Sequence, residues 1–241
     1  MLKRSLISVL LLIIAAVSSQ AQKRVSVQAE IKNLADGKVT TVTKRILCDR
    51  NGRLVTVSLK PSRFYLIQNL KGEAKLYVPS STEVYSMIDP MLSSGGELLY
   101  IFLSGHTGDL GLVSAGYMLK SSEYDGEGYL KRTYVTGKQN AAPMVDVVLK
   151  DYLPIYTEYK DNSGNTLGKT YLSGYDINSS FVFPTRVTEI TYNREKKDST
   201  VTRTVYTLPD ISGTDPDFDY QVPKGAKPAE NPLKRLKEAI K

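Results

Sequence analysis

The chain has 241 residues, 41% of them hydrophobic, and a formal net charge of +7. This length allows one large domain with a substantial core, and the mild charge is spread along the chain, which argues against nucleic-acid binding. Cys48 is the single cysteine, so an internal disulfide is excluded. Sixteen tyrosines suit a large sheet, because tyrosine packs well on a half-buried pleated surface.

Residues 1–21 have the pattern of a cleaved signal peptide. Lys3 and Arg4 form a positive start, an apolar run from Leu6 to Val17 follows, and Ser19 to Ala21 offers small residues for a signal peptidase. The apolar run is shorter than the ~20 residues of a membrane-spanning helix. We therefore expect a periplasmic mature protein; secretion and an uncleaved anchor are the alternatives.

The part from Val25 to Met87 is predicted as consecutive antiparallel strands. Apolar and polar residues alternate in it, as in half-buried strands. Asn51-Gly52 between two β-rich runs suits a type I′ hairpin turn, which needs a positive φ at both central residues. The expected strands are Val25–Ile31, Val39–Leu47, Leu54–Leu59, Phe64–Ile67, Ala74–Val78 and Val84–Met87.

Two short helices are predicted next, at Glu97 to Leu103 and at Asp109 to Ser121. The first run is apolar all round, which also fits a buried strand. In the second, apolar residues recur at three- and four-residue spacings after a possible N-cap, Asp109. Glycines flank both segments, so we expect that they can shift as a movable lid without breaking the pairing of strands.

The second half returns to strands, which brings the total to about eleven. They are expected at Tyr129–Val135, Val145–Lys150, Pro154–Lys160, Thr166–Tyr175, Arg186–Tyr192 and Thr200–Leu208. The predicted fold is mainly β with a few helices (α+β), built on one large curved antiparallel sheet. Residues 228–241 are interpreted as a proline-rich linker and a short basic amphipathic tail, which is either a solvated end or a lid or membrane-touching segment.

Residues for catalysis are scarce. His106 is the only histidine, which disfavours triads and histidine-rich metal sites. The chain has no nucleophile elbow, no HExxH motif and no phosphate-binding glycine loop. We therefore predict that the protein is not an enzyme and needs neither a cofactor nor a metal.

Several strands are apolar on both faces, which indicates that both faces of the sheet are covered. They include Phe64–Ile67, Val147–Leu149 and Phe181–Phe183. Helices over one face would leave an apolar crevice that can hold a lipid tail. An ordinary filled core is the alternative.

Short motifs in a fixed order carry a resemblance to a known family. They are Gly52-Arg53-Leu54, Lys60-Pro61, Tyr77-Val78-Pro79, Tyr152-Leu153-Pro154-Ile155, Phe183-Pro184, and the ending from Phe218 to Ala226. With them the chain, from about Val25 to Lys227, resembles the LolA-like outer-membrane lipoprotein carriers. The resemblance implies an unclosed barrel of about eleven strands whose concave side is covered by helices. Two features depart from the family: Val25–Ile31 alternates like a strand where the family has an amphipathic helix, and Lys60 replaces an arginine.

The resemblance implies a non-enzymatic periplasmic carrier, formed by residues 22–227, that shields acyl chains of a lipoprotein or another lipid. Its partners would be this cargo and possibly an inner-membrane donor complex and an outer-membrane acceptor, with a monomeric carrier. Lys60 is expected at the rim, where a cation can bind a lid carbonyl or a lipid head group. The alternative is a lipid-sensing or protein-interaction domain that moves no cargo. The candidate cavity residues are Val55, Val57, Leu59, Phe64, Leu66, Leu76, Val78, Leu99, Phe102, Leu112 and Met118.

Overall fold

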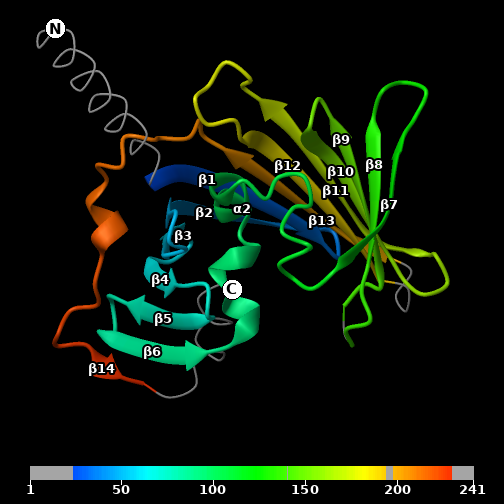
Figure 1. The fold of residues 1–241 in the computed structure, drawn as a ribbon. Coiled ribbons are helices and arrows are strands. Elements are labelled where there is room, and N and C mark those ends of the chain that lie inside the picture. The colour runs from blue at the N-terminus through cyan, green and yellow to red at the C-terminus, as the bar shows by residue number, and fades with distance from the viewer. Residues whose placement is uncertain (1–23, 140, 194–197, 230–241) are drawn as a thin grey trace, which may run out of the picture.

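The computed structural model describes residues 24–139, 141–193 and 198–229. Within them, fourteen strands form one sheet that curves around a concave side (Figure 1). Neighbouring strands are antiparallel, except that β14 (Lys227–Pro228) runs parallel to β6 (Glu83–Ile88). The two edge strands, β14 and β7 (Met118–Tyr124), do not pair with each other. The predicted fold class, a mainly β chain with a large unclosed sheet, is confirmed.

From one edge to the other, the strand order is β14-β6-β5-β4-β3-β2-β1-β13-β12-β11-β10-β9-β8-β7, so a meander of β1 to β6 and a meander of β7 to β13 meet where β1 pairs with β13. The remaining strands are β1 (Arg24–Ala35), β2 (Lys38–Asp49), β3 (Leu54–Lys60), β4 (Phe64–Gln68), β5 (Glu73–Val78), β8 (Leu130–Val135), β9 (Met144–Lys150), β10 (Leu153–Lys160), β11 (Thr166–Tyr175), β12 (Pro184–Asn193) and β13 (Asp198–Tyr206).

A turn forms at Asn51-Gly52 between β2 and β3, but it is not of the predicted type I′, because Asn51 does not share the positive φ of Gly52. Gly52 has φ +85°, a conformation that residues with a side chain rarely adopt. A Cβ at this position would also lie 2.3 Å from a side-chain carbon of Leu70. The turn therefore requires glycine for both its backbone conformation and its packing.

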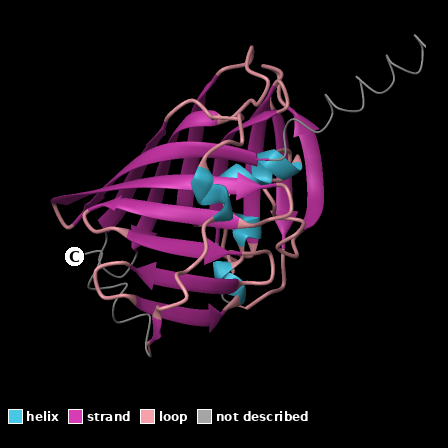
Figure 2. Ribbon diagram, turned by 90° about the vertical axis from the view of Figure 1, so that its left-hand side faces the viewer, coloured by secondary structure: helices cyan, strands magenta, loops and turns pink. Residues whose placement is uncertain are grey.

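The first predicted helix is confirmed as α2 (Leu98–Ser104). It lies on the concave side of the sheet, preceded by two 3-10 turns at Pro90–Leu92 and Ser94–Gly96 (Figure 1). Figure 2 shows these short helical pieces in front of a continuous array of strands. Gly105, with φ +82°, ends the helix, and its N–H donates to the Ile101 and Phe102 carbonyls.

The second predicted helix, Asp109 to Ser121, is wrong. Residues 106–117 form irregular turns, and Met118 already belongs to β7, which pairs with β8. Asp109 does cap backbone N–H groups, those of Gly111 and Val113. The chain cannot continue as a helix, however, because Gly111 and Gly116 have φ values of +77° and +90°.

Three further points differ from the prediction or lie outside the structure. Residues 181–183 form a loop before β12 instead of a strand. β7 and β14 were not among the expected strands, and with them the described sheet has fourteen strands. The predicted signal peptide and most of the predicted tail, residues 230–241, lie outside the described residues, and the domain boundaries stay predictions.

After β13 the chain crosses the outer, convex face of the sheet and reaches β14 (Figure 1). The 3-10 turn Pro216–Asp219 lies on this path, and arginines of the first strands hold it. Arg24 makes a 2.6 Å ion pair with Asp219, and Arg45 pairs with Asp215 and Asp217. This C-terminal segment therefore covers the outer face of the first meander, and α2 covers its inner face.

Candidate functional site

The inner face of the sheet carries one large apolar cluster, closed by α2. Leu99, Ile101, Phe102 and Leu103 of the helix are buried against strands β1 to β3. The cluster consists of Val25, Val27, Ala29, Ile46, Cys48, Leu54, Leu99, Ile101, Phe102, Leu103, Phe181 and Phe183. Its side chains are at most 9% exposed, so this part of the interior is filled in the present conformation.

Aromatic rings join α2 to the strands of the second meander. Phe102 meets Phe183 edge to face at 5.3 Å between ring centroids, and Phe183 meets Tyr206 in the same way at 5.1 Å. Tyr175 lies 6.2 Å from Phe102, and its hydroxyl donates to the Pro154 carbonyl. These contacts fix the helix by side chains alone.

Residues 105–117 cover a second inner cluster, on β8 and β9. Leu112 packs there with Leu130, Tyr134, Val145, Val147 and Leu149. A few polar contacts hold this covering segment: Arg132 donates to the Gly108 carbonyl, Tyr117 to the Ala142 carbonyl, and Lys138 to the Ala115 carbonyl. The segment makes no strand pairs, so it can move without breaking the sheet.

A polar region lies on the same inner face, beside the apolar cluster. Glu189 of β12 stands opposite Thr170 and Thr202, and Lys44 of β2 stands opposite the core residue Ala29. Glu97, the half-buried residue before α2, acts electrostatically on Glu189. We call Glu97, Glu189 and Lys44 the inner charge cluster.

The pKa of Glu189 is raised, first because the surrounding protein desolvates its carboxyl and second because of the charge of Glu97. The charge of Lys44 acts in the opposite direction. Glu189 is nevertheless exposed to solvent. Both observations fit a carboxyl that neighbouring protein groups surround without covering. Burial also raises the pKa of Tyr206 and of Tyr159, which lie near this carboxyl.

The structure brings together only part of the predicted cavity. Leu99 and Phe102 lie in the inner cluster, and cross-strand pairing places Leu66 opposite Leu76, on the same face as Leu54. Phe64 and Val78 are half-buried and share this face by alternation along their strands.

The other predicted cavity residues lie elsewhere. Val55 and Val57 are buried on the outer face, beneath Phe218 of the C-terminal segment, and Leu59 follows them by alternation. Leu112 belongs to the second inner cluster, and Met118 is 69% exposed on β7. Lys60 is exposed at the last position of β3, and its side chain makes no hydrogen bond or ion pair among the described residues.

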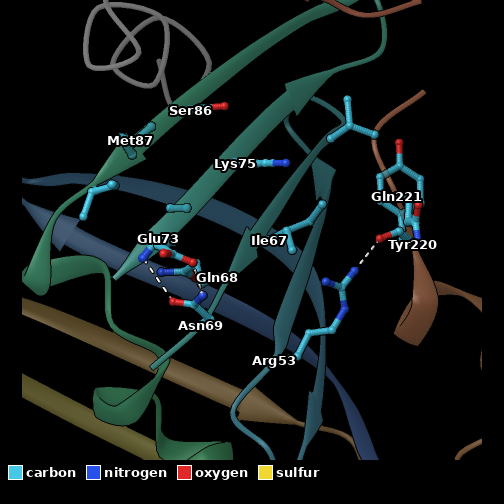
Figure 3. Close-up of a pocket in the computed structure, with 13 residues that line it drawn as sticks. Arg53, Ile67, Gln68, Asn69, Glu73, Lys75, Ser86, Met87, Tyr220 and Gln221 are labelled. Carbon is cyan, nitrogen blue, oxygen red and sulfur yellow. Dashed lines mark hydrogen bonds between the residues drawn. The ribbon is translucent and has the colours of Figure 1, made fainter. Parts of the chain in front are cut away.

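A pocket of about 710 Å³ lies on the outer face, between the C-terminal segment and strands β4 to β6 (Figure 3). Arg53 stands on one side, where its guanidinium donates to the Phe218 and Tyr220 carbonyls. Lys75 and Glu73 come from β5, and Ile88, which is 79% exposed, lies at the edge. The pocket therefore combines charged groups with apolar surface.

Sequence reasoning missed the inner charge cluster and the outer pocket. Glu189 follows Val187 by two residues on β12, so both side chains lie on the same, core-facing side of the strand. This position of a carboxyl was the signal in the sequence that could have indicated the cluster. Nothing in the sequence reports that Glu97 and Lys44 face the same interior, because they lie on elements far apart in the chain.

In the described part of the chain, no three His, Cys, Asp or Glu side chains lie close enough to hold a metal ion. None of the described helices is long and apolar enough to cross a membrane. Among known proteins, no family model matches the sequence. A search of curated proteins finds no match either.

Comparison with solved structures gives clear similarities. A LolA superfamily protein from Nitrosomonas europaea matches 78% of this chain and 86% of its own, with 13% identity and a TM-score of 0.54. For a putative outer membrane lipoprotein-sorting protein domain from Vibrio parahaemolyticus, the match covers 86% of this chain and 94% of that domain, with 14% sequence identity and a TM-score of 0.55. For a DUF1329 family protein from Desulfovibrio piger, the match covers 86% of this chain and 94% of that protein, with 16% sequence identity and a TM-score of 0.54. These identities are low and the coverage is high, so the resemblance inferred from the sequence is confirmed at the level of the fold: the chain is a divergent protein with the LolA-like fold.

Proposed function

We propose that the protein is a non-enzymatic periplasmic carrier that shelters acyl chains of a lipoprotein or another lipid against the inner face of its sheet. The fold shared with a lipoprotein-sorting domain supports this proposal. The observation that carries it is the covering of the inner face. The seven-residue helix α2 and the turn-rich segment of residues 105–117 lie over the inner apolar clusters. Neither of them forms strand pairs with the sheet.

A carrier of this kind works by exchange. A sixteen-carbon chain contributes on the order of 12 kcal/mol when it leaves water, at about 0.8 kcal/mol per buried CH₂ group. The interior must only resemble the membrane closely enough that the transfer is nearly neutral. When α2 and residues 105–117 move away, the acyl chain takes the place of their side chains against the sheet, and the apolar surface stays covered.

The proposal extends to partners. A monomeric carrier would receive its cargo from an inner-membrane donor complex and deliver it to an outer-membrane acceptor. Lys60 is exposed at the end of β3 and is our candidate for a cation that holds a head group or a lid carbonyl at the rim.

The test is the content of the protein purified from the periplasm after export with its own leader. We expect native mass spectrometry and lipid extraction to reveal bound acylated material, and we expect the delipidated protein to bind a fluorescent fatty acid. A protein that carries no lipid and ignores the probe would overturn the proposal.

A lipid-sensing or protein-interaction domain is the second candidate function. The outer pocket and the exposed Ile88 and Met91 beside β6 favour it, since apolar groups exposed near a sheet edge often mark a docking surface. Pull-down of an envelope protein that is lost in Ile88→Ala, from a chain that binds no fatty acid, would support this candidate instead.

A further inference from the structure

We propose that the inner charge cluster selects cargo by its head group, and that it prefers an amphiphile whose polar end carries a protonated amine. This inference rests on the proposed carrier function. It names the class of cargo that the same inner face would hold.

The three charged groups converge from separate elements. Glu189 comes from β12, Lys44 from β2, and Glu97 from the start of α2. Strand pairing fixes the first two on the inner face, because Thr202 stands opposite Glu189 and Ala29, a core residue, stands opposite Lys44. Tyr206 links the three groups: its ring packs against the apolar cluster, and it stands opposite Ala29, which also stands opposite Lys44. The charges of Glu97 and Glu189 both act on the Tyr206 hydroxyl.

None of the three side chains makes an ion pair or a hydrogen bond within the described residues. Carboxylates on the outer face are different. Asp146 accepts hydrogen bonds from Thr133 and Lys160, and Glu158 accepts one from Thr166. The three groups are exposed or half-buried in this conformation, so water solvates them. Cargo that displaces this water leaves the charges costly unless it brings a partner of its own, so the inner charge cluster is suited to a partner that arrives with the cargo.

The charge balance of the cluster decides which head group fits. Two carboxylates and one ammonium leave one negative charge in excess. A carboxylate or phosphate head would meet Glu97 and Glu189 as like charges. A protonated amine would pair with them, and the attraction is strengthened where surrounding protein lowers the effective dielectric constant.

Polar groups and apolar groups meet at this point. Tyr206 packs against the apolar cluster, 5.1 Å from the Phe183 ring, and the charge of Glu189 acts on its hydroxyl. Thr157 is buried on the same face, and its hydroxyl makes no hydrogen bond of normal geometry among the described residues. A head group at Glu189 would therefore place its acyl chain along Phe183 and Phe102.

The test compares three twelve-carbon probes of equal length, each below its micelle-forming concentration: dodecylamine, dodecanol and dodecanoate. Each competes with a fluorescent fatty alcohol at pH 7. We expect dodecylamine to bind at least tenfold more tightly than dodecanoate. In the double variant Glu97→Gln/Glu189→Gln, the ratio should fall to within about threefold, and the affinity for dodecanol should not change.

Glu123→Gln is the matched control, because Glu123 lies on β7, is exposed and stands opposite Lys131 of β8, away from the cluster. It should keep the wild-type ratio. Equal affinity for amine and carboxylate in the wild type, or an unchanged ratio in the double variant, would overturn the inference and leave the carrier function standing. Failure of all three probes to bind would instead contradict the carrier function.

An amine beside acyl chains can belong to an aminolipid or to the amino terminus of an acylated peptide. Phosphatidylethanolamine, and a diacylated lipopeptide with a free or an acetylated amino terminus, distinguish these sources. Selection by the cluster predicts that acetylation weakens binding of the lipopeptide. Equal binding of both lipopeptides and of a lipid with an anionic head would contradict it.

Discussion

Phe102 of α2 meets Phe183 edge to face, with 5.3 Å between their ring centroids. This contact fastens the only α-helix in the described residues to the loop that precedes β12. Cys48, the single cysteine of the chain, belongs to the same apolar cluster and is 0% exposed. Its thiol therefore reports directly whether α2 opens.

We expect Cys48 to react with a thiol reagent through local opening of α2. The opening free energy should lie several kcal/mol below the free energy of global unfolding and depend only weakly on denaturant, as in sub-global opening. Labelling rates at low urea concentrations measure it. Phe102→Ala should accelerate labelling strongly. Phe218→Ala removes a buried ring from the opposite face and should change the local-opening rate little. Labelling that requires global unfolding would contradict the lid.

Gly111 lies in a turn, whereas the sequence predicted a helix at this position, and a substitution there can distinguish the two conformations. Its φ of +77° disfavours any residue with a side chain, so Gly111→Ala should lower the free energy of unfolding by about 1–2 kcal/mol. In a helix interior the same change would raise it by about 1 kcal/mol. Urea denaturation distinguishes the two signs. Gly126→Ala is the control, because a Cβ at Gly126 meets nothing and its φ is not in the left-handed region.

The alternation of apolar residues was sufficient to predict most strands. The apolar run at Leu98–Leu103 fitted a helix or a buried strand equally well, and the structure has the helix α2 there. The prediction of a helix failed at residues 109–121, because Leu110, Val113 and Tyr117 follow a helical spacing by coincidence. The structure of this segment is determined by the positive φ values of Gly111 and Gly116 and by the pairing of Met118–Tyr124 with β8. Both depend on structure that the local sequence does not record.

The candidate site shows a related limit. Alternation correctly placed Val55 and Val57 on one face of β3, but it cannot say whether that face is concave or convex. The answer comes from Phe218 and Tyr220, far along the chain. The Tyr220 ring stacks on Tyr65 at 3.8 Å and closes the outer face. The predicted cavity residues consequently separate into an inner and an outer group.

Because the pKa of Glu189 is raised, the substitution Glu189→Gln should change the free energy of unfolding by an amount that depends on pH. A carboxyl with a raised pKa in the folded state stabilises the fold below its unfolded pKa of about 4.3, and this contribution is lost as the pH rises through the folded pKa. The charged and titratable groups that face it are Glu97, Lys44, Tyr159 and Tyr206.

At pH 7 the glutamine variant should therefore be modestly more stable than the wild type, and the gain should be smaller at pH 4. Urea denaturation at both values measures the difference, with Glu123→Gln as the control. A gain of the same size at both pH values would show that the carboxyl charge is not responsible.

Lys60 is tested by its effect on cargo. If it acts at the rim, Lys60→Leu should lose binding or release of cargo to membranes, and Lys60→Arg should retain both, because arginine keeps the charge and donates hydrogen bonds. Transfer of a fluorescent fatty acid to vesicles measures release. Unchanged transfer in the leucine variant would remove Lys60 from the site.

The most direct test of the carrier is the place where an acyl chain binds. A fatty alcohol with a photoreactive group near the end of its chain would be bound to the delipidated protein, cross-linked and mapped by mass spectrometry. The proposed function predicts labels on inner-face peptides, around Leu99 and Phe102 and around Phe183. Labels confined to the outer pocket, around Ile88 and Val222, or no specific labels at all, would contradict it.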